Sequence, residues 1–246
     1  MPHQLNWQEI CQMIPKRKAD AQKGDFGRLL CITGSRNMPG ACLLSTQAAL
    51  RGGAGLVTVA TAPENPMRLA AAAPEAMWLP LETDEAGFLR SSDQNRKTLE
   101  KQLSRANAVL LGCGLGVTEE TRRLVHWVLE QAVCPVVLDA DGLNCAVSCI
   151  ELSRRTGKDW ILTPHPGEMA RLTGHSIPQI QENRVETATQ FAAAYPVTLA
   201  LKGAGTLVAQ GSRLAQNPTG NPGMSRGGSG DVLAGLIAAF AAQGIP

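Results

Sequence analysis

Apolar residues in this chain are concentrated in short continuous runs. The runs at 29–33, 56–60, 108–111, 135–138 and 160–163 contain few polar positions. A strand that is apolar at nearly every position is buried on both of its faces, as in a parallel sheet covered by helices. We therefore expect these runs to be the central strands of such a sheet.

Between those runs, apolar residues recur at the three-to-four-residue spacing of an amphipathic helix. The clearest case is 118–133, where Thr118 is the expected N-cap and Leu124 and Val128 share one face. Further helices are expected at 40–51, 66–73, 93–105 and 176–194, with a short amphipathic helix within 1–23 and strands at 76–81, 197–201, 206–209 and 213–216.

The alternation of strands and helices predicts an α/β fold with a mostly parallel central sheet and helices on both faces. No internal repeat or linker-like tract divides the chain, so we expect a single domain over residues 1–246. Ligands of such sheets bind beyond the carboxyl ends of the strands. Polar or glycine-rich motifs follow those ends here, at 34–35, 112–116, 139–144, 165–168 and 202–206.

The segment from Asn217 to Phe240 joins a glycine-rich loop to an apolar helix. Prolines and glycines exclude helix from its first half, whereas its second half has apolar residues at helical spacing. At the junction, Gly228, Ser229 and Gly230 leave backbone N–H groups without intrahelical partners, at the positive end of the helix dipole. We expect these residues to form an anion hole suited to phosphate.

Asp231 lies on the rim of this expected anion hole. Aspartate is common as a helix N-cap, and capping alone would account for a carboxylate at a helix start. A carboxylate beside a bound phosphate is also suited to take a proton from a hydroxyl during phosphoryl transfer. The long glycine-rich approach favours the second interpretation, so we expect Asp231 to be a catalytic base.

Charge and cysteine content narrow the class of protein. The net charge is +2, and scattered Lys and Arg form no basic face interleaved with aromatic residues, so nucleic acid is not an expected partner. The longest apolar run, 233–242, is too short to span a bilayer, so no membrane association is expected. The seven cysteines include no CxxC pair and predict reduced, buried thiols in a cytoplasmic protein.

Several motifs taken together resemble a known family. They occur in the family's order and span residues 23–243: KGDFGRLLCITGS, MPGACL, ALRGGAGLVTVAT, LGCGLG, LDADGLN, LTPHPGEMARL, LKGAGT and finally NPTGNPGMSRGGSGDVLAG. In these respects the chain resembles the ADP-dependent (S)-NAD(P)H-hydrate dehydratases, which belong to the ribokinase-like superfamily. An ordered set of this kind is far more specific than one glycine-rich loop.

The resemblance implies a ribokinase-like fold and an enzyme that restores NADH or NADPH from its hydrate, with ADP as co-substrate. Phosphorylation would turn the hydroxyl of the hydrate into a leaving group, and AMP and phosphate would be released. The resemblance further implies Mg²⁺ as a cofactor and a homotetramer. Family members continue with a further helix, so a missing or truncated C-terminal helix is expected after Gly244.

One group of residues is assigned to the nucleotide. The resemblance implies that ADP is bound by Lys202, Gly203, Ala204, Gly205, Thr206 and Gly230. From the residues alone, without the resemblance, the glycines at 202–206 predict a tight hairpin turn as readily as a nucleotide contact. Both roles are compatible, because a turn without side chains lets a ligand approach the backbone closely.

A second group is assigned to the hydrated substrate: Ala41, Gly114, Gly116, His165 and Asp231. From the residues alone, Ala41 belongs to an ordinary helix start and the two glycines to a turn. The prolines on either side of His165 hold it in a rigid turn at a strand end. A histidine held in this way is expected to face a ligand.

Three acidic residues have open roles in the sequence. Glu168 is either a cap of the helix that follows it or, by analogy with related kinases, a residue that organises Mg²⁺ and its water. Asp139 and Asp141 are candidates for Mg²⁺ binding or hydrogen bonding, with capping of a helix from Leu143 as the alternative.

Two other functions fit the same fold. The alternative enzyme is a ribokinase-like small-molecule kinase, such as a thiamine-precursor or sugar kinase, that stops at a phosphorylated product. The motifs HPGE, LKGAGT and KGDFG favour the dehydratase. The third interpretation is a nucleotide-sensing module without activity, which the intact Gly-Ser-Gly-Asp sequence disfavours.

Overall fold

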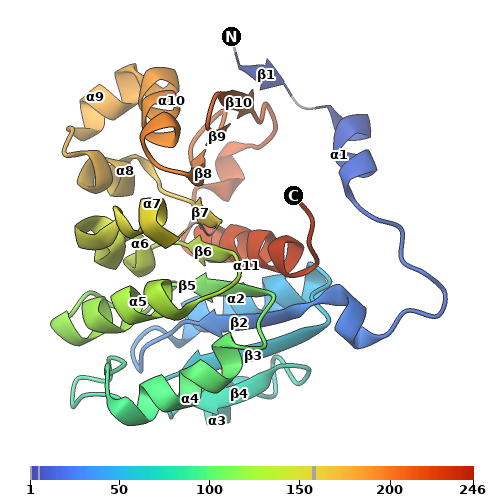
Figure 1. Cartoon of the computed structure of the whole chain (residues 1–246), viewed down its shortest axis with the longest axis vertical. Helices are drawn as coiled ribbons and strands as arrows, with labels where there is room; N and C mark the ends of the chain where they lie inside the picture. The colour runs from blue at the N-terminus through green and yellow to red at the C-terminus, as the bar shows by residue number, and fades with distance from the viewer. Residues whose placement is uncertain (1, 5, 157–158) are drawn as a thin grey trace.

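The computed structural model describes residues 2–4, 6–156 and 159–246. Its strands form one sheet in the order β1-β10-β9-β8-β7-β6-β5-β2-β3-β4 (Figure 1). The strands are β1 (His3–Gln4), β2 (Arg28–Ile32), β3 (Leu56–Thr61), β4 (Met77–Pro80), β5 (Ala108–Leu111), β6 (Val136–Leu138), β7 (Trp160–Leu162), β8 (Val197–Leu201), β9 (Leu207–Gln210) and β10 (Arg213–Gln216).

Most strand pairings in this sheet are parallel. Every pairing from β4 through β3, β2, β5, β6 and β7 to β8 is parallel. At the other edge, β9 runs antiparallel to both β8 and β10, and β1 runs parallel to β10. The prediction of a mostly parallel sheet is confirmed, including the expected strand at 213–216.

Helices cover both faces of the sheet. The helices are α1 (Trp7–Met13), α2 (Pro39–Arg51), α3 (Asn65–Leu69), α4 (Asp93–Leu103), α5 (Glu119–Gln131), α6 (Asp141–Ala146), α7 (Leu152–Thr156), α8 (Pro166–Thr173), α9 (Ile177–Glu182), α10 (Arg184–Ala194) and α11 (Ser229–Ala242), with short 3₁₀ turns η1 (Lys23–Phe26), η2 (Val147–Cys149) and η3 (Pro222–Met224). Helices α2, α3 and α11 pack on one face, and helices α4, α5, α6, α8, α9 and α10 pack on the other.

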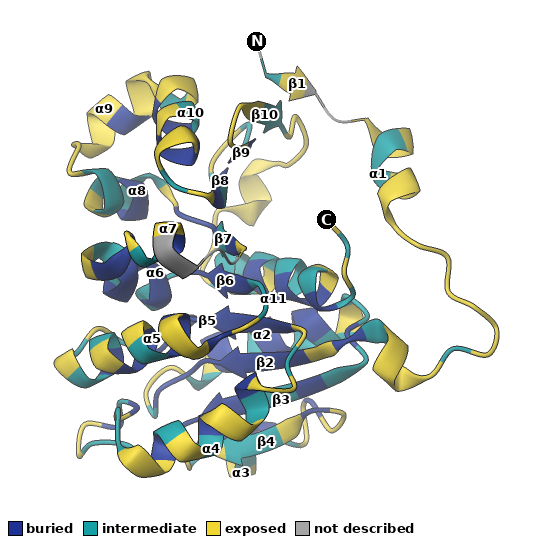
Figure 2. Ribbon diagram, in the orientation of Figure 1, coloured by how far each residue is buried: buried dark blue, intermediate teal, exposed yellow. Residues whose placement is uncertain are grey.

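Alternate residues of each strand enter separate hydrophobic clusters. In β2, Leu30 and Ile32 belong to the cluster beneath α4 and α5, whereas Leu29 and Cys31 belong to the cluster beneath α2 and α11. All four side chains are at most 1% exposed. Figure 2 shows the central strands buried throughout, while the outer surfaces of the helices are exposed. Burial on both faces explains why these strands are apolar at consecutive positions.

Helix α11 packs closely against α2. A Cβ atom built on Gly235 would lie 2.2 Å from the carbonyl oxygen of Ser45, so only glycine allows this approach. Buried small residues of α11, such as Ala234, Ala238 and Ala239, continue the contact surface along the helix. This packing fixes the N-terminus of α11 relative to the strand ends.

The structure corrects two predicted helices. The single helix expected at 176–194 is two helices, because Asn183 leaves the helical conformation and serves as both the C-cap of α9 and the N-cap of α10. Asparagine competes for backbone hydrogen bonds, and this competition favours helix ends over interiors. The helix expected at 66–73 ends at Leu69 and continues as a turn. Among the described residues, no helix has the length and apolar character needed to cross a membrane.

Candidate active site

The expected functional motifs come together beyond the carboxyl ends of the parallel strands. Strands β5, β6, β7 and β8 lie side by side, and the segments that follow them contribute Cys113, Asp139, Thr163 and Lys202. The Cys113, Thr163 and Lys202 side chains all contact the Asp139 carboxylate. The position agrees with the general location of ligand sites in sheets of this kind.

The start of α11 excludes one of the two interpretations of Asp231, namely that it is the N-cap of the helix. Gly228 is the N-cap, in the left-handed conformation with φ of 90°, and Ser229 begins the helix. Asp231 is therefore the third residue of the helix, and its interpretation as the N-cap is wrong. A glycine cap has no side chain to cover the N-terminal N–H groups, which suits an anion, and the Ser229 N–H donates only a long hydrogen bond of 3.4 Å to the Arg226 carbonyl. The carboxylate of Asp231 is then free of the capping role.

Asp139 is the centre of a buried polar network. Its Oδ1 atom lies 2.6 Å from Nζ of Lys202 and accepts a hydrogen bond of 2.7 Å from the Thr163 hydroxyl. Its Oδ2 atom lies 3.9 Å from Sγ of Cys113. The residue is 1% exposed, so these partners replace water for its carboxylate.

The structure favours hydrogen-bonding roles over capping for both aspartates after β6. Ala140 is the N-cap of α6, and its side chain makes no capping bond. Asp141 instead accepts a hydrogen bond of 2.7 Å from the backbone N–H of Gly116. The predicted capping role of Asp139 and Asp141 is therefore wrong in this structure. Their actual partners stabilise the loops after β5 and β8.

His165 and Glu168 form the capping box of α8. Nδ1 of His165 accepts from the backbone N–H groups of Gly167 and Glu168, and a carboxylate oxygen of Glu168 accepts from the N–H of His165 at 2.7 Å. When neutral, the imidazole therefore carries its proton on Nε2, which lies 3.3 Å from the other Glu168 oxygen. The expected capping role of Glu168 is confirmed, and its role toward Mg²⁺ stays a prediction.

Burial shifts the protonation of the carboxylates near the strand ends. Burial raises the pKa of Glu168, and the ammonium group of Lys202, 3.7 Å away, opposes this effect. Burial also raises the pKa of Asp231, with the negative charge of Asp139 as the second cause. A carboxylate whose pKa is raised accepts a proton more readily, which suits the role expected for Asp231.

The segment 202–206 is a hairpin loop and also reaches the start of α11. Strands β8 and β9 pair antiparallel with Leu201 opposite Leu207, so the predicted turn is confirmed. A Cβ atom on Gly230 would lie 3.4 Å from Nζ of Lys202. The two glycine-bearing segments expected to bind one nucleotide are therefore in contact.

The residues assigned to the hydrated substrate lie on the neighbouring loops. A Cβ atom on Gly114 would lie 2.9 Å from Cβ of Ala41, so these two residues adjoin. Gly116, in the left-handed region with φ of 76°, is next to Phe88 and is held by Asp141. Ala41 lies in the first turn of α2, as predicted. These contacts agree with a common location for the assigned residues, while their binding roles stay predictions.

The described side chains suit Mg²⁺ only in part. Cys113, Asp139 and Asp231 each present one ligand atom within 4.8 Å of the others. However, the ammonium group of Lys202 already neutralises Asp139, and a thiol is a poor ligand for this hard cation. Mg²⁺ commonly binds through one or two carboxylates together with substrate phosphates. The carboxylates of this cluster therefore suit Mg²⁺ only as an ion that would arrive with a nucleotide.

Sequence reasoning missed three contributors to this region. Cys113 and Thr163 contact Asp139 directly. Arg184, the first residue of α10, donates from its guanidinium to the carbonyl oxygens of Leu201 and Lys202 and so holds the hairpin. The position of Thr163 as the last residue of a predicted strand was an available signal. Cys113 lies within the glycine-rich motif 112–116, but no pattern singled out its side chain, and none pointed to Arg184.

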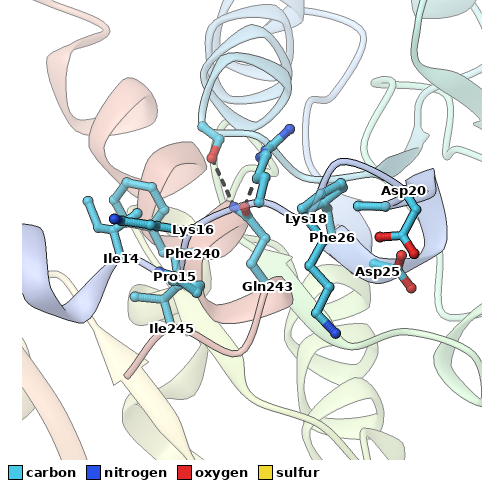
Figure 3. Close-up of a pocket in the computed structure, with 13 residues that line it drawn as sticks. Ile14, Pro15, Lys16, Lys18, Asp20, Asp25, Phe26, Phe240, Gln243 and Ile245 are labelled. Carbon is cyan, nitrogen blue, oxygen red and sulfur yellow. Dashed lines mark hydrogen bonds between the residues drawn. The ribbon is translucent and has the colours of Figure 1, made fainter.

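The larger of the two described surface cavities is not at this site. It has a volume of about 550 Å³ and lies at the opposite end of the sheet, between the segment before β2 and the C-terminal end of α11 (Figure 3). Arg17 is one of the residues that line it, with its guanidinium 3.9 Å from the centre of the Phe26 ring and donating a hydrogen bond to the Gly53 carbonyl. Volume alone therefore does not locate the candidate active site, whereas the charged network does.

Solved structures define the class to which this architecture belongs. A ribokinase-like superfamily protein from Enterococcus faecalis superposes with a TM-score of 0.82 at 29% identity, covering 98% of this chain and 80% of that chain. An ADP/ATP-dependent NAD(P)H-hydrate dehydratase from Bacillus subtilis, co-crystallised with ATP and Mg²⁺, superposes with a TM-score of 0.78 at 29% identity. The match covers 99% of this chain and 86% of that chain. The fold is ribokinase-like, as predicted.

Sequence comparison identifies the family. A family model described as NAD(P)H-hydrate dehydratase matches residues 29–245. The bifunctional NAD(P)H-hydrate repair enzyme of Coxiella burnetii is 40% identical over 240 residues, covering 97% of this chain and 46% of that protein. The ADP-dependent (S)-NAD(P)H-hydrate dehydratase of Xanthomonas campestris is 38% identical over 234 residues, covering 95% of this chain and 78% of that protein. The chain belongs to the NAD(P)H-hydrate dehydratase family, and it spans less than half the length of the Coxiella relative.

Proposed function

We propose that this chain is an ADP-dependent dehydratase that converts the S epimer of hydrated NADH or NADPH into NAD(P)H, with release of AMP and phosphate. The observation that carries the proposal is the meeting of Asp231, in the first turn of α11, with the hairpin 202–206 beyond the strand ends. A base, a helix N-terminus and a glycine-rich loop are thus adjacent. Relatives named as ADP-dependent (S)-NAD(P)H-hydrate dehydratases support the substrate.

Asp231 acts first, as the base for phosphoryl transfer. It takes the proton from the hydroxyl of the hydrate, and the resulting oxygen attacks the terminal phosphorus of ADP. The bond between that phosphorus and the bridging oxygen breaks, and AMP leaves with the electron pair. The N–H groups of Gly228, Ser229, Gly230 and Asp231 hold the transferring phosphate, since the helix dipole favours negative charge there.

Elimination then completes the reaction. The phosphate leaves the substrate carbon with the electron pair of the C–O bond, the adjacent ring carbon gives its proton to water, and the electrons of that C–H bond form the ring double bond. Asp231 returns its own proton to solvent. The anion hole stabilises the departing phosphate as it stabilised the transferring group. Mg²⁺ bound with the nucleotide supplies charge neutralisation of the phosphates. The net change is loss of one water from the hydrate and hydrolysis of ADP to AMP and phosphate.

The remaining assigned residues bind and orient the two substrates. The hairpin residues Gly203, Ala204, Gly205 and Thr206 hold the adenine nucleotide through their backbone. Ala41, Gly114 and Gly116 face the hydrated nicotinamide nucleotide. His165, whose side chain is 51% exposed, contacts the same substrate.

Turnover of hydrated NADH is the direct test. The protein is incubated with hydrated NADH and Mg²⁺, with ADP or ATP, and recovery of the reduced-nicotinamide absorbance is followed. We expect recovery with ADP, in step with formation of AMP and phosphate. A phosphorylated hydrate that accumulates without recovery would instead identify the alternative kinase. Absence of both products would contradict an enzymatic role on this substrate.

Assembly and compartment extend the proposal. We propose a homotetramer in the cytoplasm, on the family resemblance and on thiols that are mostly buried among the described residues. Light scattering of the purified protein tests the assembly, and a mass of one or two chains would contradict it.

A further inference from the structure

A short hairpin follows β4 and has no part in the proposed reaction. Thr83 and Leu89 pair across it in antiparallel orientation, and Leu89 is fully buried in the cluster beneath α4 and α5. The Asp84 carboxylate accepts from the backbone N–H of Phe88, and the Asp84 N–H donates to the Phe88 carbonyl, both at 2.9 Å. Residues 83–89 therefore form an ordered element beyond the carboxyl end of β4.

Hydrogen bonds join this hairpin to the loops of the candidate site. Arg36, in the turn after β2, donates its N–H to the Gly87 carbonyl and its guanidinium to the Glu85 carbonyl, each at 2.9 Å. The same turn is bonded to the loop after β5, because the Ser35 N–H donates to the Gly114 carbonyl at 2.7 Å. The hairpin is thus fixed relative to the loop that carries Gly114, one of the residues assigned to the hydrated substrate.

Phe88 lies directly against that loop. A Cβ atom built on Gly116 would overlap the Phe88 ring, which is partly exposed. Met38 borders the same loop: a Cβ atom on Gly114 would lie 2.9 Å from Cβ of Met38, and Met38 is 50% exposed. The loop after β5 is therefore bordered by two accessible apolar side chains, a surface suited to a flat apolar group.

Phe88 is also the only aromatic residue in the described segments that lead from a strand to the helix after it. The other aromatic residues lie in helices or strands or in turns that precede a strand: Trp7, Phe26, Trp78, Trp127, Trp160, Phe191, Tyr195 and Phe240. The ring of Phe88 is therefore in the region where ligands of such sheets bind.

The place of Phe88 separates it from the reacting atoms. In the proposed reaction the hydroxyl of the hydrate meets Asp231, whose carboxylate lies within 4.8 Å of the Cys113 sulfur. Phe88 contacts the same loop three residues further on, at Gly116. A different part of the substrate therefore faces Phe88.

The chemistry of the hairpin favours a base over a phosphate at this place. Asp84 and Glu85 precede Phe88, and carboxylates repel a phosphate group. Adenine is uncharged and flat, whereas the hydrated nicotinamide ring has tetrahedral carbons where water has added and stacks less well. Stacking of a base on an aromatic side chain is a common mode of nucleotide recognition.

We propose that Phe88 determines substrate specificity by stacking on the adenine base of the hydrated dinucleotide, with Met38 as a second apolar contact on the same loop. The inference rests on the proposed function and adds to it a contact for the adenine half of the substrate. It makes the enzyme selective for dinucleotides, because a mononucleotide with the same reacting ring lacks the base that Phe88 binds.

A comparison of two substrates tests the inference. Hydrated NADH is compared with the hydrate of reduced nicotinamide mononucleotide, which has the same reacting ring and no adenine. We expect kcat/KM to favour hydrated NADH by at least about tenfold in the wild type, and Phe88→Leu to lower this preference by about tenfold through KM for hydrated NADH. Phe88→Tyr keeps the ring and should keep the preference. An equal kcat/KM for both substrates in the wild type, or a full preference in Phe88→Leu, overturns the inference.

Equilibrium binding separates this inference from the proposed function. NADH and reduced nicotinamide mononucleotide are titrated by nicotinamide fluorescence with ADP at saturation, so that the hairpin 202–206 is occupied. Phe88→Leu should weaken NADH binding by about tenfold relative to the mononucleotide. If hydrated NADH is not turned over, the proposed function fails, while this result still supports stacking. Equal affinities for NADH and the mononucleotide in the wild type, or an equal change in both, overturn the inference.

Matched variants exclude an effect of packing. Phe240→Leu removes another exposed ring, at the C-terminal end of α11, and should leave the substrate preference unchanged. Met38→Ala removes the second apolar contact with little loss of packing, since Met38 is half exposed, and should lower the preference by about threefold. If Phe88→Leu does not fold, Met38→Ala is the deciding variant, and an unchanged preference there overturns the inference.

Discussion

Asp231 acquires its chemical character from residues that are distant in the sequence. Cys113 and Asp139 follow different strands, and Lys202 comes from a hairpin at a third. The helix that carries Asp231 begins with Gly228 as its cap, so the Asp231 carboxylate does not serve as the N-cap. At the scale of the residue, the proposed catalytic role and the helix cap thus belong to different residues, Asp231 and Gly228.

This separation gives a clear expectation for Asp231→Asn. The variant should fold normally, since Gly228 and not Asp231 caps α11. Loss of the proton acceptor should lower turnover by roughly 10²- to 10⁴-fold, while the affinity for ADP is kept by the backbone amides. Single-turnover kinetics and nucleotide titration measure the two quantities. Asp93→Asn, in the first turn of α4, is the control; near-normal turnover in Asp231→Asn would contradict the catalytic assignment.

The raised pKa of Asp231 also predicts how stability depends on pH. Burial raises its pKa in the folded protein, so the folded state holds the proton to higher pH than the unfolded state does. The stability that this group contributes at low pH is then lost as pH rises above about 4, the ordinary value for aspartate. We expect Asp231→Asn to gain thermal stability relative to the wild type as pH increases. A difference in Tm that is constant with pH would contradict this.

Helix α11 connects the site to the packing of the molecule. Its first turn supplies the expected anion hole, and Gly235, one turn further along, meets the backbone of α2. A displaced α11 would move the amides and Asp231 together. The element therefore has two constraints, an uncovered N-terminus and a surface without bulky side chains.

Gly235→Ala should destabilise the protein, although alanine is the better helix former. The added Cβ would lie 2.2 Å from the Ser45 carbonyl oxygen, and backbone atoms cannot move aside cheaply. We expect a net loss of roughly 1–3 kcal/mol in the free energy of unfolding, which exceeds the intrinsic gain of about 1 kcal/mol. In Gly40→Ala the new Cβ meets nothing within 4 Å, so denaturant titration should show no loss. Equal effects of the two substitutions would refute the packing argument.

The hairpin 202–206 and the start of α11 should respond to ADP as one element. They are in contact through Lys202 and Gly230, although different parts of the sequence supply them. Saturating ADP should slow amide hydrogen exchange at both 203–206 and 229–231, with helix α4 as the unaffected reference. Protection of only one segment would reject a shared nucleotide site.

At the scale of the whole molecule, one sheet places all the loops of the candidate site together, at the carboxyl ends of its parallel strands. The order β8-β7-β6-β5-β2 brings the loops after these strands next to one another. The larger cavity, which the segment before β2 helps to line, lies at the amino-terminal ends of these strands. Ligand binding at the carboxyl ends of the strands should therefore be measurable as a change in the stability of the entire sheet.

Removal of metal should distinguish Mg²⁺ bound with nucleotide from Mg²⁺ held by the protein alone. Because Lys202 already neutralises Asp139, EDTA should leave the Tm of the nucleotide-free protein unchanged. ADP with Mg²⁺ at 100 times Kd should stabilise the fold by about 2.7 kcal/mol, which raises Tm by roughly 5–10 °C for a chain of this size. EDTA should reduce that increase. A lower Tm in EDTA without nucleotide would indicate a metal site within the protein.

The sequence by itself predicted most of the helices and strands and the place of the candidate site. Continuous apolar runs predicted the parallel strands because such strands are buried on both faces, and glycines at 227, 228 and 230 marked the uncovered helix start. Both are properties of local composition. The family motifs then named the residues at the strand ends.

Tertiary structure alone decided the partners of each charge. Whether Asp231 caps its helix depended on the left-handed conformation of Gly228, and whether Asp139 caps, binds metal or pairs depended on Lys202, 63 residues away. The division of 176–194 at Asn183, in contrast, agrees with the local preference of asparagine for helix ends. Local patterns specify backbone conformation, but the energy of a buried charge depends on the neighbours that folding brings to it.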